Sequence, residues 1–299
     1  MLAVFFILIV LISIGITIFT VVIYLKITRS WILETENWTP AHFNLRYDFF
    51  SIEMIDKTLI SAWHIKVNNP KAVMIVSHGQ SNSKSMILPY IEQFAYLGYD
   101  IIIYDLRSHG KSTKNRCTIG ALESNDLSQV ISYTIANISK KLPIVLWGFS
   151  LGATVSLIVA GKFPAVKAVI AQSPFVSIHG VISWYLWKFW NCPPWPFTSL
   201  VMLLMKIKIK IKPKSIDIKT VAKQLSNKSI LLLGADNDLQ VPTFWLDEIQ
   251  NLLGINCKKI IGPYGHLELA AVCTNKEKSP DFKFVDDFIS ETITEKNKC

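Results

Sequence analysis

The sequence predicts an α/β fold: a mainly parallel sheet with helices on both faces, preceded by one transmembrane helix. Short apolar runs of strand length alternate with amphipathic stretches of helical length, and this pattern calls for a parallel sheet covered on both faces. The chain has 299 residues, 51% of them hydrophobic, which is enough for a sizeable core. Its first 25 residues contain no charged side chain, which sets them apart from the remainder.

The segment 1–25 is dominated by Ile, Val, Leu and Phe, and about 20 such residues span a bilayer core. A cleaved signal peptide is the alternative, but it would need a basic start, a shorter apolar core and small residues at a cleavage site. None of these features is present. Lys26 and Arg29 follow the span, so the positive-inside rule predicts a single-pass membrane protein with its remainder in the cytoplasm.

Charge and cysteine content narrow the class of protein further. The net charge of +9 could indicate nucleic acid, but much of the excess is local, which favours an anionic membrane as the partner. The local excess consists of Lys206, Lys208, Lys210, Lys212 and Lys214. The five cysteines are odd in number, widely spread and without a C-x-x-C pair, which argues against a zinc site or a disulfide framework and fits reduced thiols. No cofactor and no metal is expected.

The elements follow one another in an order that places functional groups along one edge of the sheet. After a linker at 26–46, the α/β domain is expected at 47–299. Strands are expected at 47–54, 58–67, 71–76, 100–104, 144–147, 166–171, 230–233 and 260–261, the first two as an antiparallel pair. Helices are expected at 86–97, 120–138, 153–160, 243–253 and 282–293. Ligands of such sheets bind at the carboxyl ends of the strands.

The stretch Gly148-Phe-Ser-Leu-Gly152 lies between a buried strand and an apolar helix. A strand that turns into a helix within so few residues needs a tight bend, and the two glycines let the backbones approach there. Ser150 is then held at the tip, next to the N-terminus of a helix that favours negative charge. This arrangement predicts a nucleophilic serine.

A serine nucleophile requires a base and an acid that orients the base. His266 follows the last expected strand in the glycine-containing loop Gly262-Pro-Tyr-Gly-His266. Asp236 and Asp238 follow the preceding strand. The chain order Ser150, Asp238, His266 is the order that this architecture uses.

The motif series resembles that of the α/β-hydrolase superfamily, and most closely the peptidase- and esterase-like serine hydrolases with an N-terminal membrane helix. The motifs are His78-Gly79, Asp105-Leu-Arg-Ser-His-Gly-Lys-Ser112, Gly148-Phe-Ser-Leu-Gly152, Ser173-Pro-Phe175, Asp238-Leu-Gln-Val-Pro242 and Gly265-His266. The resemblance implies the α/β-hydrolase fold, with a mostly parallel eight-stranded sheet, and a cap insertion at about 178–214. It also implies a catalytic triad of Ser150, Asp238 and His266, because the acid of the family-like pattern stands just before a Val-Pro pair, as Asp238 does, and Asp236 lies two residues too early.

By the same resemblance the backbone N–H groups of Gln80 and Leu151 would form the oxyanion hole. Two fixed donors must face the tetrahedral oxygen in such a reaction. His78 is expected to have an orienting or structural role. Asp105, Arg107 and His109 are expected to brace their loop.

The predicted function is a membrane-anchored serine hydrolase that cleaves an ester, thioester or amide through an acyl-enzyme. A carboxylesterase or lipase acting on a small or lipid-derived acyl substrate is favoured. A serine peptidase, an acyltransferase and a non-catalytic binding protein of the same fold remain alternatives.

The cap insertion combines aromatic residues, an apolar run and the five lysines. The aromatic residues are Trp184, Tyr185, Trp187, Phe189, Trp190, Trp195 and Phe197. This order of residues favours contact with the bilayer and an apolar acyl pocket. The alternative is that the aromatics cover the pocket and that the Lys-Ile alternation is an amphipathic edge strand.

Overall fold

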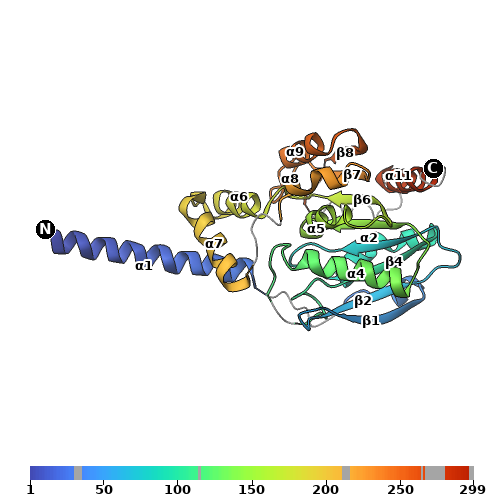
Figure 1. Ribbon diagram of the computed structural model, residues 1–299, viewed down its shortest axis with the longest axis horizontal. Coiled ribbons are helices and arrows are strands. Elements are labelled where there is room, and N and C mark those ends of the chain that lie inside the picture. The colour runs from blue at the N-terminus through green and yellow to red at the C-terminus, as the bar shows by residue number, and fades with distance from the viewer. Residues whose placement is uncertain (30–35, 114–115, 211–215, 264, 267–279, 296–299) are drawn as a thin grey trace.

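An eight-stranded sheet runs through the body of the protein (Figure 1). The computed structural model describes residues 1–29, 36–113, 116–210, 216–263, 265–266 and 280–295. The strands lie in the order β1-β2-β4-β3-β5-β6-β7-β8. They are β1 (Tyr47–Glu53), β2 (Leu59–Ile65), β3 (Ala72–Ser77), β4 (Tyr99–Tyr104), β5 (Ile144–Phe149), β6 (Val166–Gln172), β7 (Ser229–Ala235) and β8 (Cys257–Gly262). β2 pairs antiparallel with β1 and β4, and the other neighbours pair in parallel, which confirms the predicted fold class.

Helices cover both faces of this sheet. The helices of the described residues are α1 (Leu2–Ile27), α2 (Lys84–Ile91), α3 (Gln93–Tyr96), α4 (Glu123–Asn137), α5 (Leu151–Ala160), α6 (Ile178–Trp190), α7 (Pro194–Ile209), α8 (Ile218–Val221), α9 (Phe244–Leu253) and α11 (Pro280–Glu295), of which α1, α6 and α7 lie beyond the sheet (Figure 1). Short 3-10 turns occupy Pro40–Phe43, Ala222–Leu225 and Gly254–Asn256. The expected helix at 86–97 is interrupted between α2 and α3, close to Pro89, which has no backbone N–H to donate.

The central strands are apolar on both sides because each side packs on a different helical layer. In β3, Val73 and Ile75 face the cluster that includes α4, α5 and α9. Met74 and Val76 face the cluster that includes α2, α3 and α11. Successive side chains of a strand point to opposite faces, so an unbroken apolar run is what a strand buried on both sides requires.

The segment between β6 and β7 begins with the two helices α6 and α7, which pack on each other and lie beside the end of α1 (Figure 1). We call α6 and α7 the cap. Helix α7 continues through Ile209, with Lys206 and Lys208 in its last turn. The edge-strand alternative is therefore wrong for residues 206–209, and Lys212 and Lys214 lie outside the described residues.

Helix α1 projects from the body (Figure 1), and residues 1–15 are exposed throughout. Among the described residues it is the one helix long and apolar enough to cross a membrane. Its last two turns contact the body, where Thr20, Ile23 and Tyr24 are buried.

Candidate active site

Ser150 lies at the turn that joins β5 to α5. Its backbone is in an uncommon conformation, with φ 50° and ψ −110°, which a sharp strand-to-helix turn imposes. Its N–H donates a hydrogen bond to the carbonyl of Gln172 (2.7 Å), and its own carbonyl accepts one from the N–H of Thr154 (3.1 Å). The turn is thus fixed on the strand side and on the helix side, as the sequence predicts.

The glycines on either side of Ser150 are required by close backbone contacts. A Cβ on Gly148 would lie 2.2 Å from the carbonyl oxygen of Gly152. A Cβ on Gly152 would lie 2.2 Å from the carbonyl oxygen of Ser77, at the end of β3. Neither distance is possible for a real side chain, so the expected approach of strand and helix depends on both glycines.

Asp238 and His266 are in direct contact. Oδ2 of Asp238 lies 2.6 Å from Nδ1 of His266. The other oxygen, Oδ1, accepts hydrogen bonds from the N–H groups of Gln240 (2.9 Å) and Val241 (2.8 Å), which hold the carboxylate in place. Asp236 is exposed, and its backbone N–H bonds to the carbonyl of Gly262.

The surroundings of Asp238 favour its ionised form. Burial by itself raises the pKa of this carboxyl, but the hydrogen bond and charge of His266 and the N–H of Val241 oppose burial. The balance leaves the pKa of Asp238 below its ordinary value. The carboxylate therefore keeps its charge next to the imidazole.

Ser150 and His266 line one cavity of about 580 Å³, a volume typical of small-molecule sites. Gln80 and Leu151, the residues expected to supply the oxyanion hole, line it as well. Its walls are mostly apolar and come from α2, from α6 and from the end of α1. The structure thus brings the predicted site residues to one cavity, and Asp238 contacts the cavity through His266.

Two buried histidines hold the loop that contains Gln80. Nε2 of His78 accepts a hydrogen bond from the N–H of Leu106 (2.9 Å), and its Nδ1 bonds to the carbonyl of Gly79 (2.7 Å). His109 accepts from the N–H of Ser81 (3.2 Å) and bonds to the carbonyl of Arg107 (2.8 Å). Burial lowers the pKa of His109, and that of His78 well below its ordinary value, so both rings are neutral.

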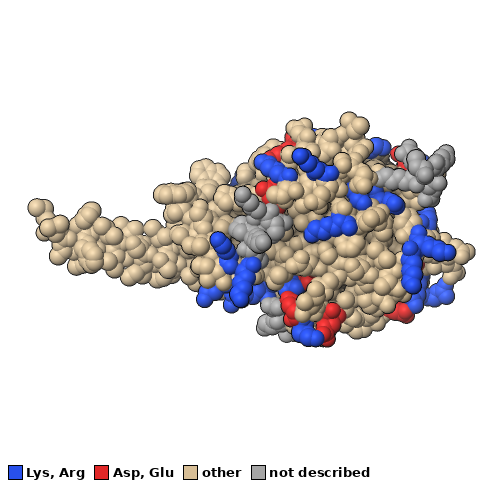
Figure 2. Space-filling view, viewed as in Figure 1, with Lys and Arg blue, Asp and Glu red and all other residues tan. Residues whose placement is uncertain are grey.

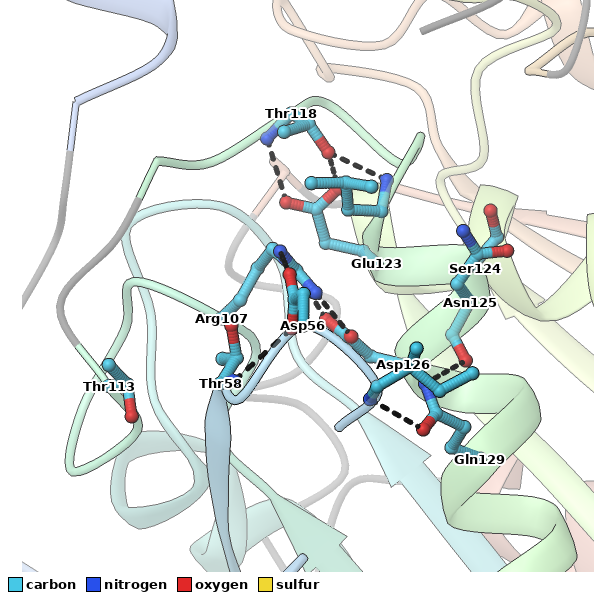
Figure 3. A network of polar contacts seen from close by, with 12 residues as sticks. Asp56, Thr58, Arg107, Thr113, Thr118, Glu123, Ser124, Asn125, Asp126 and Gln129 are labelled. Carbon is cyan, nitrogen blue, oxygen red and sulfur yellow. Dashed lines mark hydrogen bonds and ion pairs between the residues drawn. The ribbon is translucent and has the colours of Figure 1, made fainter. Parts of the chain in front are cut away.

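The loop after β4 is fixed by ion pairs away from the cavity. Arg107 binds both oxygens of Asp126 (2.6 Å each) and one of Asp56 (2.9 Å), as Figure 3 shows. Burial raises the pKa of Asp126 to about 6, although Arg107 opposes this. Asp105 accepts a 2.6 Å bond from buried Lys84. These contacts give Asp105, Arg107 and His109 bracing positions in their loop.

The sequence does not reveal that the end of α1 forms part of the cavity. Ile23, Lys26, Ile27 and Arg29 line it. Helix α1 is apolar on every side, so no amphipathic pattern marks the face that packs on the body. Among the described residues, no group of three His, Cys, Asp or Glu side chains is placed to hold a metal ion.

Residues 68–234, more than half of the chain, match the family described as serine aminopeptidase, S33. The matched part includes Ser150 and ends before Asp238 and His266. The solved esterase Pf2001 of Pyrococcus furiosus has a TM-score of 0.71 and 22% identity, over 87% of this chain and 96% of that one.

The matches to curated relatives cover a smaller part of this chain. The uncharacterized protein YqkD of Bacillus subtilis (strain 168) is 25% identical over 206 residues, which cover 65% of this chain and 67% of YqkD. The uncharacterized membrane protein YNL320W of Saccharomyces cerevisiae is 29% identical over 158 residues, 51% of this chain and 55% of that one. The monoglyceride lipase homolog of Monkeypox virus is 29% identical over 119 residues, 38% of this chain and 42% of that one. This chain is a hydrolase of the serine aminopeptidase S33 family with the α/β-hydrolase fold.

Proposed function

We propose that this protein is a membrane-anchored serine hydrolase that cleaves a carboxylic ester of an acyl chain through an acyl-enzyme intermediate. The observation that carries the proposal is that one largely apolar cavity is lined by both Ser150 and His266. Ser150 stands on a strained turn, and His266 is bonded to Asp238. The proposed organisation is an anchor at 1–25, a linker at 26–46 and a hydrolase domain at 47–299 with its cap insertion at about 178–214.

In the proposed reaction, Oγ of Ser150 attacks the carbonyl carbon of the substrate and Nε2 of His266 accepts the hydroxyl proton. Asp238 holds the Nδ1–H tautomer and stabilises the imidazolium that forms. The oxyanion accepts hydrogen bonds from the N–H groups of Gln80 and Leu151, the latter in the first turn of α5, where the helix dipole favours negative charge. His266 then returns the proton to the departing alcohol, and water hydrolyses the acyl-enzyme by the same route.

The lining of the cavity favours an ester over a peptide with a free N-terminus. An aminopeptidase must bind a cationic amino group, for which an acidic side chain is the natural partner. No Asp or Glu is among the described residues that line the cavity. The apolar walls suit an acyl chain, and the monoglyceride lipase homolog is a relative whose name points to such a substrate.

Two features favour membrane anchorage. Helix α1 has the length and composition of a membrane span, and one relative is named a membrane protein. The cap beside α1 exposes Trp187, Trp195 and Ile207, residues that suit a bilayer interface. On the view of Figure 2, the projecting helix shows no charged side chain, and Lys and Arg gather where it meets the body.

A fluorophosphonate probe tests the proposal directly. The full chain should be labelled covalently at Ser150, and Ser150→Ala should abolish labelling. Ser81→Ala is the matched control, because Ser81 lines the same cavity and its backbone N–H, which bonds to His109, is retained, so Ser150 should still be labelled. Labelling of Ser150→Ala at the wild-type rate would refute the mechanism.

A further inference from the structure

The end of α1 forms part of the wall of the cavity. Ile23, 1% exposed, and Ile27 line the cavity together with Ser150. The side-chain amide of Gln80 donates a hydrogen bond to the carbonyl of Ile27 (3.1 Å). The backbone of Gln80 is also a proposed oxyanion donor, so one residue joins the end of α1 to the reacting centre.

Further contacts fix the direction in which α1 approaches. Nη1 of Arg116 donates to the hydroxyl of Tyr24 (2.7 Å). The ring of Phe19 meets that of Phe197 edge-on, with centroids 5.0 Å apart, and lies 6.0 Å from that of Trp190. Because α1 is held to the loop before α4 and to both cap helices, the residues that follow these contacts reach the cavity at a defined place.

Two cationic side chains are among those residues. Lys26 and Arg29 both line the cavity, and both are exposed to solvent. Nζ of Lys26 lies 4.9 Å from the ring centroid of Trp190, another lining residue. Lys26 and Arg29 therefore place two positive charges at this end of the cavity, and the described lining residues include no Asp or Glu.

The height of these cations relative to a bilayer follows from helix geometry. Residues 2–19 have a helical rise of about 27 Å, close to the hydrocarbon thickness of about 30 Å. Lys26 and Arg29 come about 10–15 Å further along, at the level of the lipid head groups and the adjoining water. An amphiphile in that leaflet could place its head group beside them and its acyl ester in the cavity.

We propose that Lys26 and Arg29 bind the anionic head group of the substrate, and that the substrate is a single-chain acyl ester whose head group carries a phosphate. Ile23 and Ile27 of the same helix contact its acyl chain. Helix α1 is then both the anchor and a specificity-determining part of the site. This inference rests on the proposed ester hydrolase.

The test compares substrates with one acyl chain but different head groups. The full chain is placed in nanodiscs of zwitterionic lipid, and kcat/KM is measured for lysophosphatidylglycerol and for the monoacylglycerol of the same chain length. We expect the wild type to prefer the phosphate-bearing ester. Lys26→Gln and Arg29→Gln should each lower the ratio of the two kcat/KM values about fivefold, mainly through KM.

Two further variants separate recognition from folding and from general surface charge. Lys26→Arg keeps both the charge and the contact with Trp190, so it should retain the preference. Lys188→Gln removes an exposed cap lysine that is not among the lining residues, and it should leave the ratio unchanged. An equal loss of preference in Lys188→Gln would show that general attraction, not the site, is responsible, and would overturn the inference.

The outcomes also distinguish this inference from the proposed function. If Ser150 is labelled and both esters are hydrolysed equally well, the ester hydrolase stands and the head-group site is refuted. If Lys26→Gln leaves the ratio of the wild type unchanged, the head-group site is likewise refuted. If neither ester is hydrolysed and Ser150 is not labelled, both proposals fail.

Discussion

Asp238 contacts His266 with one carboxylate oxygen, at 2.6 Å, and is held by two backbone N–H groups through the other. The two oxygens thus have separate partners, so the carboxylate is fixed before it orients the imidazole. Asp236, two residues earlier, is exposed. We therefore expect substitution of Asp238, but not of Asp236, to impair catalysis.

Asp238→Asn should lower kcat for ester hydrolysis by about 10⁴, because the amide cannot hold His266 in the required tautomer. Asp236→Asn should change kcat less than twofold and is the matched control, since it removes one charge from the same loop. Steady-state rates with a soluble ester check both variants. Equal losses, or a larger loss in Asp236→Asn, would contradict the assignment of the acid.

The neutral histidines His78 and His109 predict a loss of stability in mild acid. Each has a folded-state pKa below the ordinary value of about 6.5, so below that pH the unfolded chain binds more protons than the folded one. The free energy of unfolding should therefore be unaffected by these groups above about pH 6.5. As the pH falls below that value it should decrease by up to about 1.4 kcal/mol per pH unit for each ring.

Denaturant unfolding at pH 7.5, 6.5 and 5.5 measures this dependence. His109→Asn removes one titrating ring, so its unfolding free energy should vary less with pH than that of the wild type. His42→Asn is the control, because His42 is exposed and lies in the turn before β1. Asp126, whose pKa is raised to about 6, has the opposite effect in this range, so the comparison between the two proteins is decisive. An unfolding free energy that varies with pH equally in the wild type and in His109→Asn would show that this ring does not stay neutral.

The turn around Ser150 should tolerate no side chain at its glycines. Gly148→Ala would place a Cβ 2.2 Å from backbone atoms of α5, so the strand and helix must separate. Overpacking costs about 1–3 kcal/mol where side chains can yield, and more is expected here because backbone must move. Gly180→Ala is the control, since its Cβ would meet a serine hydroxyl at 3.2 Å. Thermal unfolding of the two variants checks the difference.

The strand positions, and the placing of the candidate site residues at strand ends, could be predicted because their signals are local. An apolar run such as residues 71–76 can be buried on both faces only in a covered sheet, and β3 occupies 72–77. Ser150, Asp238 and His266 each follow a strand, and the carboxyl ends of parallel strands share one edge. Their meeting at one cavity therefore needs only the order of the strands in the sheet.

The contribution of α1 to the cavity could not be predicted in this way. Its packing depends on where the cap lies, and no pattern within this 26-residue helix selects Ile23 or Ile27 over their neighbours. The alternation of Lys and Ile from residue 206 onward also gives a wrong prediction, because alternation with a period of two suggests a strand. Residues 206–209 instead continue a helix whose preceding turns bury Val201, Met202 and Met205.

The cap is expected to contact the bilayer through its exposed apolar side chains. Trp187 and Trp195 are 60% and 79% exposed, and Lys206, Lys208 and Lys210 are exposed at the end of α7. In nanodiscs, bromine-labelled acyl chains should quench the fluorescence of the full chain, and Trp187→Tyr with Trp195→Tyr should reduce the quenched fraction. Trp38→Tyr is the control, as Trp38 is exposed in the linker. Quenching that is unaltered by the cap substitutions would contradict membrane contact at these positions.

The hydrolase domain is expected to face the cytoplasm. Lys26 and Arg29 follow the apolar span directly, and cationic residues near a span are retained on the cytoplasmic side. Cys117, Cys192 and Cys257 are free and buried, which agrees with a reducing compartment.

Protease added to intact cells should leave the domain uncut, whereas the same protease should digest it after lysis. A periplasmic or extracellular marker protein, cleaved in the intact cells, is the control for protease access. Cleavage of the domain in intact cells would show that the orientation is the opposite one, in which Lys26 and Arg29 face lipids of the outer leaflet.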